Sequence, residues 1–307
     1  MFTQQELHHS IHTLLDQAGQ IILGKNQQIR LAVCCLIAKG HLLIEDMPGV
    51  GKTTLSHALA KLFAMDYQRI QFTSDLLPAD MIGSSIFDSS SQTFNFHPGP
   101  LFNQMILADE INRSTPKAQS ALLEAMEEQQ ITVEGRTYDL PRPFFVIATQ
   151  NPHHQLGTFP LPESQLDRFL MRISLGYPDK AAERNLLQGQ NRHELLETLS
   201  PVISSDQLTF LQAEITKIHA SDALLDYLQD ILLFSRQWHE YDCGLSPRAG
   251  LALLNAARAW AFLEKRDAVI PEDIQTVLKP VAAHRLNPHV ADAASVIAPI
   301  LEKVAIP

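Results

Sequence analysis

The residues with the clearest chemical potential form the segment MPGVGKTT at 47–54. It follows the apolar run HLLIE and precedes a helix-like pattern at Leu55, Leu59 and Leu62, which is the order of strand, phosphate loop and helix. Backbone N–H groups of such a loop bind phosphate oxygens, and the positive end of the following helix lies against the same anion. The segment therefore predicts a nucleotide phosphate site.

The residues of this loop have separate expected roles. Lys52 is expected to reach the β- and γ-phosphates, and the Thr53 hydroxyl to hold magnesium. Asp46 stands where the general phosphate-loop pattern has glycine, so the match is partial, and Lys-Thr after Gly-x-Gly also occurs in ordinary turns. The other loop residues expected to contact the nucleotide are Pro48, Gly49, Val50, Gly51 and Thr54.

The segment MILADE at 105–110 places two carboxylates at the end of an apolar strand. We expect Asp109 to hold magnesium through its water shell, and Glu110 to orient or deprotonate an attacking water. A buried strand that enters a solvated turn could also end in two acids. The phosphate loop favours the catalytic interpretation, because both signals then belong to one reaction.

A third strand-like segment, FFVIATQN at 144–151, ends in an amide. If its strand lies between those that precede the phosphate loop and Glu110, Asn151 can position the same water. Thr149 and Gln150 are interpreted as structural. Because asparagine before Pro152 is also an ordinary turn former, the role of Asn151 depends on its neighbours.

Arg168 lies just before the last strand-like run and is a candidate to neutralise the transferred phosphoryl group. Such a guanidinium often comes from a neighbouring subunit. The alternative is a salt bridge to Asp167 or another acid, and Arg172 competes for the same role.

Arg248 is unusual for its place in a predicted helix. Ser246 suits the N-cap and Pro247 the first helical position, so Arg248 lies in the first turn, where the positive helix end disfavours a cation. We expect contact with an ATP phosphate, the alternative being a surface cation.

The order of elements predicts an α/β fold. Strand-like runs separated by helical segments indicate a parallel sheet covered on both faces, where ligands gather at the carboxyl ends of the strands. Apolar spacing predicts helices over 2–23 and 26–39. The strand-like runs are His41–Glu45, Tyr67–Phe72, Met105–Ala108, Phe144–Thr149 and Phe169–Leu175.

Two hairpins interrupt this alternation. They are predicted at 85–96 and at 130–140, the second turning at Glu134 and Gly135. Connecting segments of this kind serve either as surface decoration or as substrate contacts, and the sequence leaves both open.

After Tyr177 the chain becomes helix-like, which places a domain boundary near 178–182. We expect an α/β core at 1–180 and a smaller all-helical domain at 181–307. The helices expected in the second domain are Leu208–Ile218, Ala223–Trp238, Pro247–Glu264 and Pro271–Leu278.

Composition narrows the class of protein. A net charge of −10 disfavours a broad nucleic-acid-binding face, although this charge is compatible with a local basic lining in an assembled ring. Adjacent Cys34 and Cys35 with distant Cys243 form no disulfide framework. The start MFTQQELHHS is no secretory signal, and 31–38 is too short an apolar run for membrane insertion. We therefore expect a cytoplasmic protein.

The sequence contains 13 histidines. The pairs that suggest a metal are His8 with His12, at helical spacing, and His153 with His154. Neither pair lies beside a matching set of carboxylates or thiolates, so we expect no transition metal.

Taken in order, these motifs resemble the ATPase machinery of AAA+ proteins. Three blocks, RIQFTSDLLPADMIGS at 69–84, ADEINRSTPKAQSALLEAMEE at 108–128 and LPESQLDRFLMRI at 161–173, are similar to the MoxR family. The resemblance covers nearly the whole chain. MoxR-like proteins also tolerate an acid at the position of Asp46.

The resemblance implies an αβα P-loop NTPase core with a five-stranded parallel sheet, a helical lid, and a ring, expected to be hexameric, with ATP and Mg²⁺ between subunits. It also implies that 85–96 belongs to the helix-2 insert and 130–140 to the hairpin before sensor 1. Whether Arg248 acts on the nucleotide of its own subunit or on that of a neighbour stays open. The implied roles are Walker A at Lys52 and Thr53, Walker B at Asp109 and Glu110, sensor 1 at Asn151, an arginine finger at Arg168 and sensor 2 at Arg248.

Members of this family resemble magnesium chelatase subunits and are thought to act as chaperones with partners that bear a von Willebrand factor A domain. The resemblance thus predicts ATP-driven remodelling of protein clients or maturation of metal cofactors. The alternatives are a nucleotide-switched binding module with little turnover and a nucleic-acid motor, which the acidic composition disfavours.

Overall fold

The centre of the molecule is a five-stranded parallel sheet, seen in a computed structural model that describes residues 2–90, 92–151, 158–188, 192–290 and 292–307. The strand order is β2-β5-β8-β1-β9. The strands are β1 (His41–Glu45), β2 (Tyr67–Gln71), β5 (Met105–Asp109), β8 (Phe145–Gln150) and β9 (Phe169–Ile173). The predicted sheet is confirmed, and β8 lies between β1 and β5, as the predicted role of Asn151 requires.

Alternate side chains of the strands enter two hydrophobic cores, one on each face of the sheet. Leu42 and Ile44 pack in one core with residues of helices α1 (Gln4–Ile21), α2 (Asn26–Ile37) and α3 (Lys52–Leu62), and Leu43 packs in the other. This second core contains residues of α4 (Pro78–Ile82), α5 (Pro116–Glu128) and α6 (Glu163–Leu166). Period-two alternation of buried strands explains the three layers.

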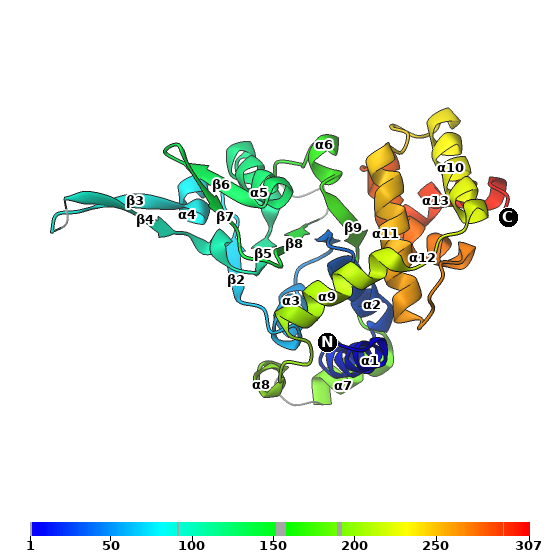
Figure 1. The fold of residues 1–307 in the computed structure, drawn as a ribbon, viewed down its shortest axis with the longest axis horizontal. Coiled ribbons are helices and arrows are strands. Elements are labelled where there is room, and N and C mark those ends of the chain that lie inside the picture. The colour runs from blue at the N-terminus through cyan, green and yellow to red at the C-terminus, as the bar shows by residue number, and fades with distance from the viewer. Residues whose placement is uncertain (1, 91, 152–157, 189–191, 291) are drawn as a thin grey trace.

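Both predicted hairpins are present and project from the sheet (Figure 1). Strands β3 (Gly83–Asp88) and β4 (Thr93–Pro98) form a long arm, and β6 (Gln130–Val133) and β7 (Arg136–Asp139) form a shorter hairpin. Short 3₁₀ turns occur at Pro100–Phe102, Ile111–Arg113 and Ile215–Lys217. The rings of Phe96 and Tyr138 stack with centroids 4.3 Å apart, so the two hairpins contact each other.

From Lys180 onward every regular element described is a helix. α12 continues past the predicted end at Leu278 and through Pro280. Burial of one face against β9 and α11 outweighs the local cost of proline in a helix. The helices are α7 (Lys180–Gln188), α8 (Arg192–Thr198), α9 (Ser205–Glu214), α10 (Asp222–Gln237), α11 (Pro247–Leu263), α12 (Pro271–Leu286) and α13 (Ala293–Lys303), of which α7, α8 and α13 were not predicted.

His41 joins three elements at the amino end of the sheet. Its Nδ1 accepts a hydrogen bond from the Val146 N–H at 3.0 Å, and its Nε2 lies 3.2 Å from the Met126 carbonyl oxygen. A neutral ring with its hydrogen on Nε2 satisfies both contacts. Burial lowers the pKa of His41 from 6.5 to about 4, against a smaller opposing effect of the Met126 carbonyl.

Stability is therefore expected to fall with acidification between pH 6.5 and 4, because the unfolded chain binds a proton at His41 that the folded chain excludes. The contribution is fully present above pH 6.5, and about 2 kcal/mol of it is lost by pH 5. Urea unfolding at pH 7.5 and 5 should show a smaller difference for His41→Gln than for the parent. Parallel pH profiles would contradict this.

Candidate nucleotide-binding site

The carboxyl ends of β1, β5 and β8 surround a cavity of about 390 Å³. This cavity brings together residues from four segments that are distant in the sequence. Val50 does not line it, since its side chain packs against the hydrophobic core. The lining residues are Pro48, Gly49, Gly51, Lys52, Thr53, Thr54, Arg69, Gln71, Asp109, Glu110 and Asn151.

The phosphate loop depends on two glycines with left-handed backbone conformations. Gly49 has φ of 84° and Gly51 has φ of 98°, values that side chains disfavour. Gly51 is the N-cap of α3, so the first N–H groups of that helix adjoin the cavity. The loop thus has the backbone needed to bind an anion.

The Lys52 ammonium group is buried within the loop. It donates to the Asp46 carbonyl oxygen at 2.7 Å and to Asn151 Oδ1 at 3.5 Å. Burial lowers the pKa of Lys52, and the carboxylates of Asp46, Asp109 and Glu110 oppose this shift. Lys52 is therefore placed to exchange these contacts for an incoming phosphate.

The side chain of Asp46 explains the departure from glycine at this position. One carboxylate oxygen accepts hydrogen bonds from Ser174 Oγ at 3.0 Å and the Gly176 N–H at 2.6 Å. The other accepts the Met47 N–H at 2.8 Å. Asp46 thereby fastens the start of the phosphate loop to the segment that leads from β9 towards the helical region.

Asp109 receives hydrogen bonds on both carboxylate oxygens. Thr149 Oγ1 donates to Oδ1 at 2.6 Å, and Arg69 contacts Oδ2 through Nε at 3.0 Å and Nη2 at 2.5 Å. Thr149 also accepts the Glu110 N–H at 2.9 Å. Thr149 thus aligns the two acids with each other, consistent with the structural role predicted for it.

Glu110 lies beside Asn151, as the predicted strand order requires. Asn151 Nδ2 donates to Glu110 Oε1 at 3.1 Å, and Gln71 Nε2 donates to Oε2 at 2.9 Å. Arg113 forms an ion pair with Oε2 at 3.0 Å. The backbone of Glu110 has φ of 56°, a conformation that costs roughly 1–2 kcal/mol for a residue with a side chain.

The cavity has suitable oxygen donors for magnesium. The Thr53 hydroxyl and the Asp109 carboxylate both line it, and oxygen ligands are what Mg²⁺ prefers. The guanidinium of Arg69 on Asp109 Oδ2 also shows that positive charge is accommodated at this carboxylate. These residues fit a hydrated magnesium ion.

Arg168 and Arg248 do not line this cavity. Arg168 precedes β9, at the end of the sheet opposite the phosphate loop, and a five-residue strand spans roughly 16 Å. Ser246 caps α11 as predicted, and Arg248 follows in its first turn. Both arginines form ion pairs with Glu127 and line a separate cavity.

Arg172 has a different environment from its competitor Arg168. Its side chain is only 9% exposed and pairs with Glu45 at 3.0 Å. It also donates to the Pro288 carbonyl oxygen at 3.0 Å. Arg172 therefore joins β1, β9 and the end of α12 as a buried ion pair.

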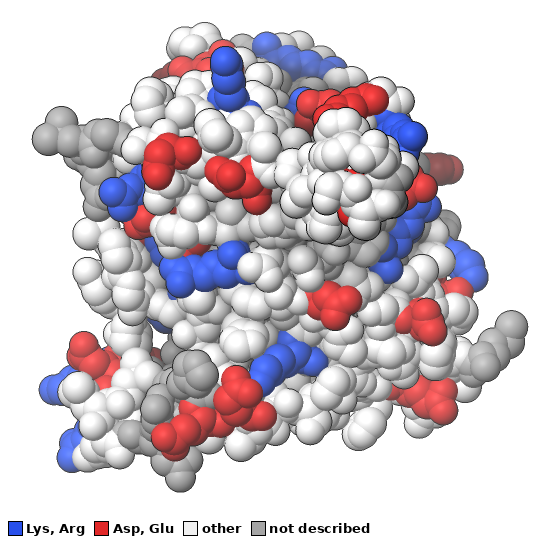
Figure 2. All heavy atoms as spheres, turned by 90° about the vertical axis from the view of Figure 1, so that its left-hand side faces the viewer, with Lys and Arg blue, Asp and Glu red and all other residues white. Residues whose placement is uncertain are grey.

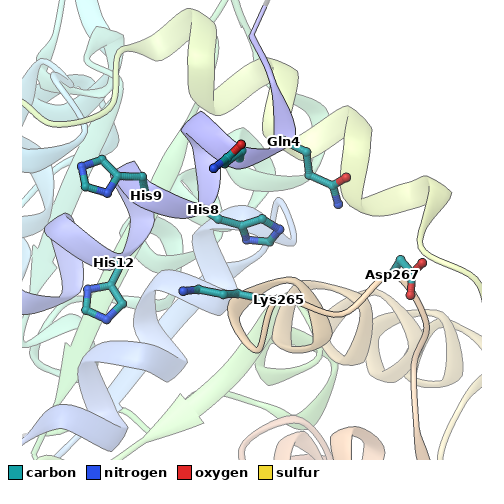
Figure 3. Close-up of a pocket in the computed structure, with 7 residues that line it drawn as sticks. Gln4, His8, His9, His12, Lys265 and Asp267 are labelled. Atoms are coloured by element: carbon teal, nitrogen blue, oxygen red, sulfur yellow. The ribbon is translucent and has the colours of Figure 1, made fainter.

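A larger cavity, of about 800 Å³, lies between α1 and the loop after α11 (Figure 3). The His8 ring stacks on Phe262, and His12 pairs with Asp16. Burial, aided by Lys265, lowers the pKa of His8. Within the described residues no three His, Cys, Asp or Glu side chains group as metal ligands; His153 and His154 lie outside that part.

Comparison with known proteins identifies the ATPase core and the helical region. Residues 41–171 match the model of the ATPase family associated with various cellular activities (AAA), and residues 235–303 match the AAA lid domain. Chaperone MoxR1 of Mycobacterium tuberculosis is 37% identical over 97% of this chain and 83% of its own length. The chain belongs to the MoxR family of AAA+ ATPases.

Two further proteins are similar to this chain over nearly its whole length. The Bacillus subtilis protein YeaC is 46% identical to this MoxR family member over 94% of the chain and 90% of YeaC. The crystal structure of a putative ATPase from Cytophaga hutchinsonii has a TM-score of 0.88 and 36% identity, covering 99% of this chain and 97% of that one. The helical region of this MoxR protein is thus an AAA+ lid, and no described helix is long and apolar enough to cross a bilayer.

Proposed function

We propose that this MoxR family member binds and hydrolyses ATP in the cavity at the phosphate loop. The observation that carries the proposal is that one cavity is lined by Lys52, Asp109, Glu110 and Asn151. Within it, the Asn151 amide donates a hydrogen bond to the Glu110 carboxylate. The loop N–H groups and Lys52 bind the phosphates. Glu110, held by Asn151, accepts a proton from the attacking water.

Magnesium would be held by Thr53 directly and by Asp109 through water, and when bound it neutralises charge on the phosphates. Thr149 keeps the Asp109 carboxylate turned towards the cavity, since it donates to Oδ1. The Arg69 guanidinium must leave Oδ2 if a hydrated ion is to approach that oxygen.

The protein is further proposed to act as a ring, hexameric as the family resemblance implies. Arg168 and Arg248 line a cavity other than the one at the phosphate loop of their own chain, which supports their action on the nucleotide of a neighbour. In this arrangement Arg168 is the arginine finger and Arg248 is sensor 2 acting between subunits.

The proposed work of the ring is remodelling of protein clients in the cytoplasm, with a partner that bears a von Willebrand factor A domain. The name Chaperone MoxR1 of the M. tuberculosis relative supports a client protein as the target. The β3–β4 arm supports it as well, since Phe87 and Phe94 are 49% and 66% exposed on it. The boundary between core, 1–180, and lid, 181–307, is where the two parts would move.

Replacing Lys52 with Ala tests the site. The expected result is a Kd for ATP raised about 10- to 100-fold, because a charge-assisted hydrogen bond contributes about 1.5–3 kcal/mol. Calorimetric titration with ATP measures binding, and phosphate release by the parent protein measures hydrolysis. Lys117→Ala, an exposed lysine of α5, is the control. Equal ATP affinity in both variants would overturn the assignment.

The two alternative functions are a nucleotide-switched binding module and a nucleic-acid motor. Gln71 and Arg113 hold Glu110 in the structure, as a nucleotide-switched module with slow turnover would require. A nucleic-acid motor is disfavoured, because Lys and Arg are interspersed with Asp and Glu on the face that carries the arm (Figure 2). DNA-stimulated, salt-sensitive turnover would identify that motor.

A further inference from the structure

Glu127, near the end of α5, joins two arginines from different parts of the protein. Its Oε2 pairs with Arg168 Nη2 at 3.0 Å, and its Oε1 pairs with Arg248 Nη2 at 2.8 Å. Arg168 belongs to the core and Arg248 to the first turn of α11 in the lid. A single carboxylate therefore fixes the position of one arginine relative to the other.

The cavity beside Glu127 has an excess of positive charge. Arg168, Arg248 and Glu127 line a cavity of about 230 Å³ together with Asp167 and Arg285, which pair with each other. Two guanidinium groups thus share one carboxylate. Their side chains are 30% and 60% exposed, so N–H donors remain available to an anion.

We propose that Glu127 is a positioning residue that holds Arg168 and Arg248 together as one binding site for the triphosphate of a second copy of this chain. Two guanidinium groups repel each other unless an anion lies between them. Glu127 supplies that anion before the nucleotide arrives, and the approaching phosphates meet both arginines already oriented. The inference rests on the proposed ATPase function and extends it to a new residue.

The geometry also couples the lid to the core. A rotation of α11 that moved Arg248 would break its contact with Glu127 and leave Arg168 with the carboxylate. The two arginines are correctly spaced only in lid orientations that keep both contacts. Glu127 thus makes the spacing between Arg168 and Arg248 sensitive to the orientation of the lid.

The test replaces Glu127 with Gln, which keeps the size of the side chain and removes its charge. We expect kcat to fall about 10- to 100-fold, the value of a charge-assisted contact, with ATP affinity and KM nearly unchanged, because the chain's own phosphate loop is intact. Glu128→Gln, the adjacent exposed carboxylate on the same helix, should retain kcat. Circular dichroism confirms that each variant is folded.

Mixing subunits distinguishes action on a neighbour from a local defect. Rings assembled from equal amounts of Glu127→Gln and Glu110→Gln chains should regain activity, since roughly a quarter of the interfaces then combine an intact Glu110 with an intact arginine pair. Absence of recovery would overturn the role of Glu127.

A parallel mixture separates the two levels of the proposal. Arg168→Ala mixed with Glu110→Gln should recover in the same way, because Arg168 itself is proposed to act on the neighbour. If this mixture recovers and the Glu127→Gln mixture does not, the inference fails and the proposed function stands. If neither recovers, the placement of the arginines between subunits fails, and the inference fails with it.

Discussion

Replacing Glu110 with Gln is expected to reduce ATP turnover by about 10²- to 10⁴-fold, the usual contribution of a general base. A neutral amide has the same shape but cannot accept the proton of the attacking water. ATP binding should persist, because the glycine loop and Lys52, which line the cavity, are proposed to bind the phosphates without Glu110. Single-turnover assays with labelled ATP measure hydrolysis, and a fluorescent analogue measures binding.

The matched control is Glu134→Gln in the turn of the β6–β7 hairpin, an exposed acid that does not line the cavity and belongs to a separate two-stranded sheet. It should keep the parental rate. If purified Glu110→Gln and parent protein hydrolyse ATP equally under conditions in which rings form, Glu110 does not have the proposed role.

Removing the guanidinium in Arg168→Ala is expected to have a still larger effect, a loss of about 10³- to 10⁵-fold in turnover. This side chain would neutralise charge that develops only as the phosphoryl group transfers, so kcat should change far more than the affinity for ATP. Steady-state kinetics at concentrations where rings form give both constants.

Arg172→Ala gives an informative contrast with Arg168→Ala. Arg172 is buried against Glu45, so its loss should lower the melting temperature by removing a buried ion pair that joins β1 to β9. Arg136→Ala, on the exposed hairpin, should change neither stability nor turnover. A catalytic loss in Arg172→Ala with normal stability, and none in Arg168→Ala, would reverse the assignment of the two arginines.

The sequence was sufficient to predict the sheet because each central strand is an apolar run that ends at a chemically distinctive residue. Asp109 is the last residue of one such run, and Asn151 directly follows another. Parallel strands bring their carboxyl ends to one edge of the sheet, so the two side chains meet there. The helix start at Ser246 was also predictable, because N-capping is a local interaction.

What the sequence missed depends on packing between distant segments. Arg69 and Gln71 lie on the edge strand β2, and the alternation of Arg69, Ile70 and Gln71 was the available signal that two polar side chains share one face. Glu127 lies in the block 108–128 that resembles the MoxR family, but nothing in its spacing predicted its ion pairs with Arg168 and Arg248, which are distant from it in the chain.

The contact between Phe96 and Tyr138 has a mechanical consequence. The β6–β7 hairpin begins where α5 ends, with Gln129 as the connecting residue. A load on the β3–β4 arm would therefore reach this hairpin through the stacked rings, and through the hairpin the last turn of α5. A polypeptide pulled against the arm would therefore apply force to the helical turn that carries Glu127. Force from the client and the positioning of the arginine pair would then depend on the same turn of α5.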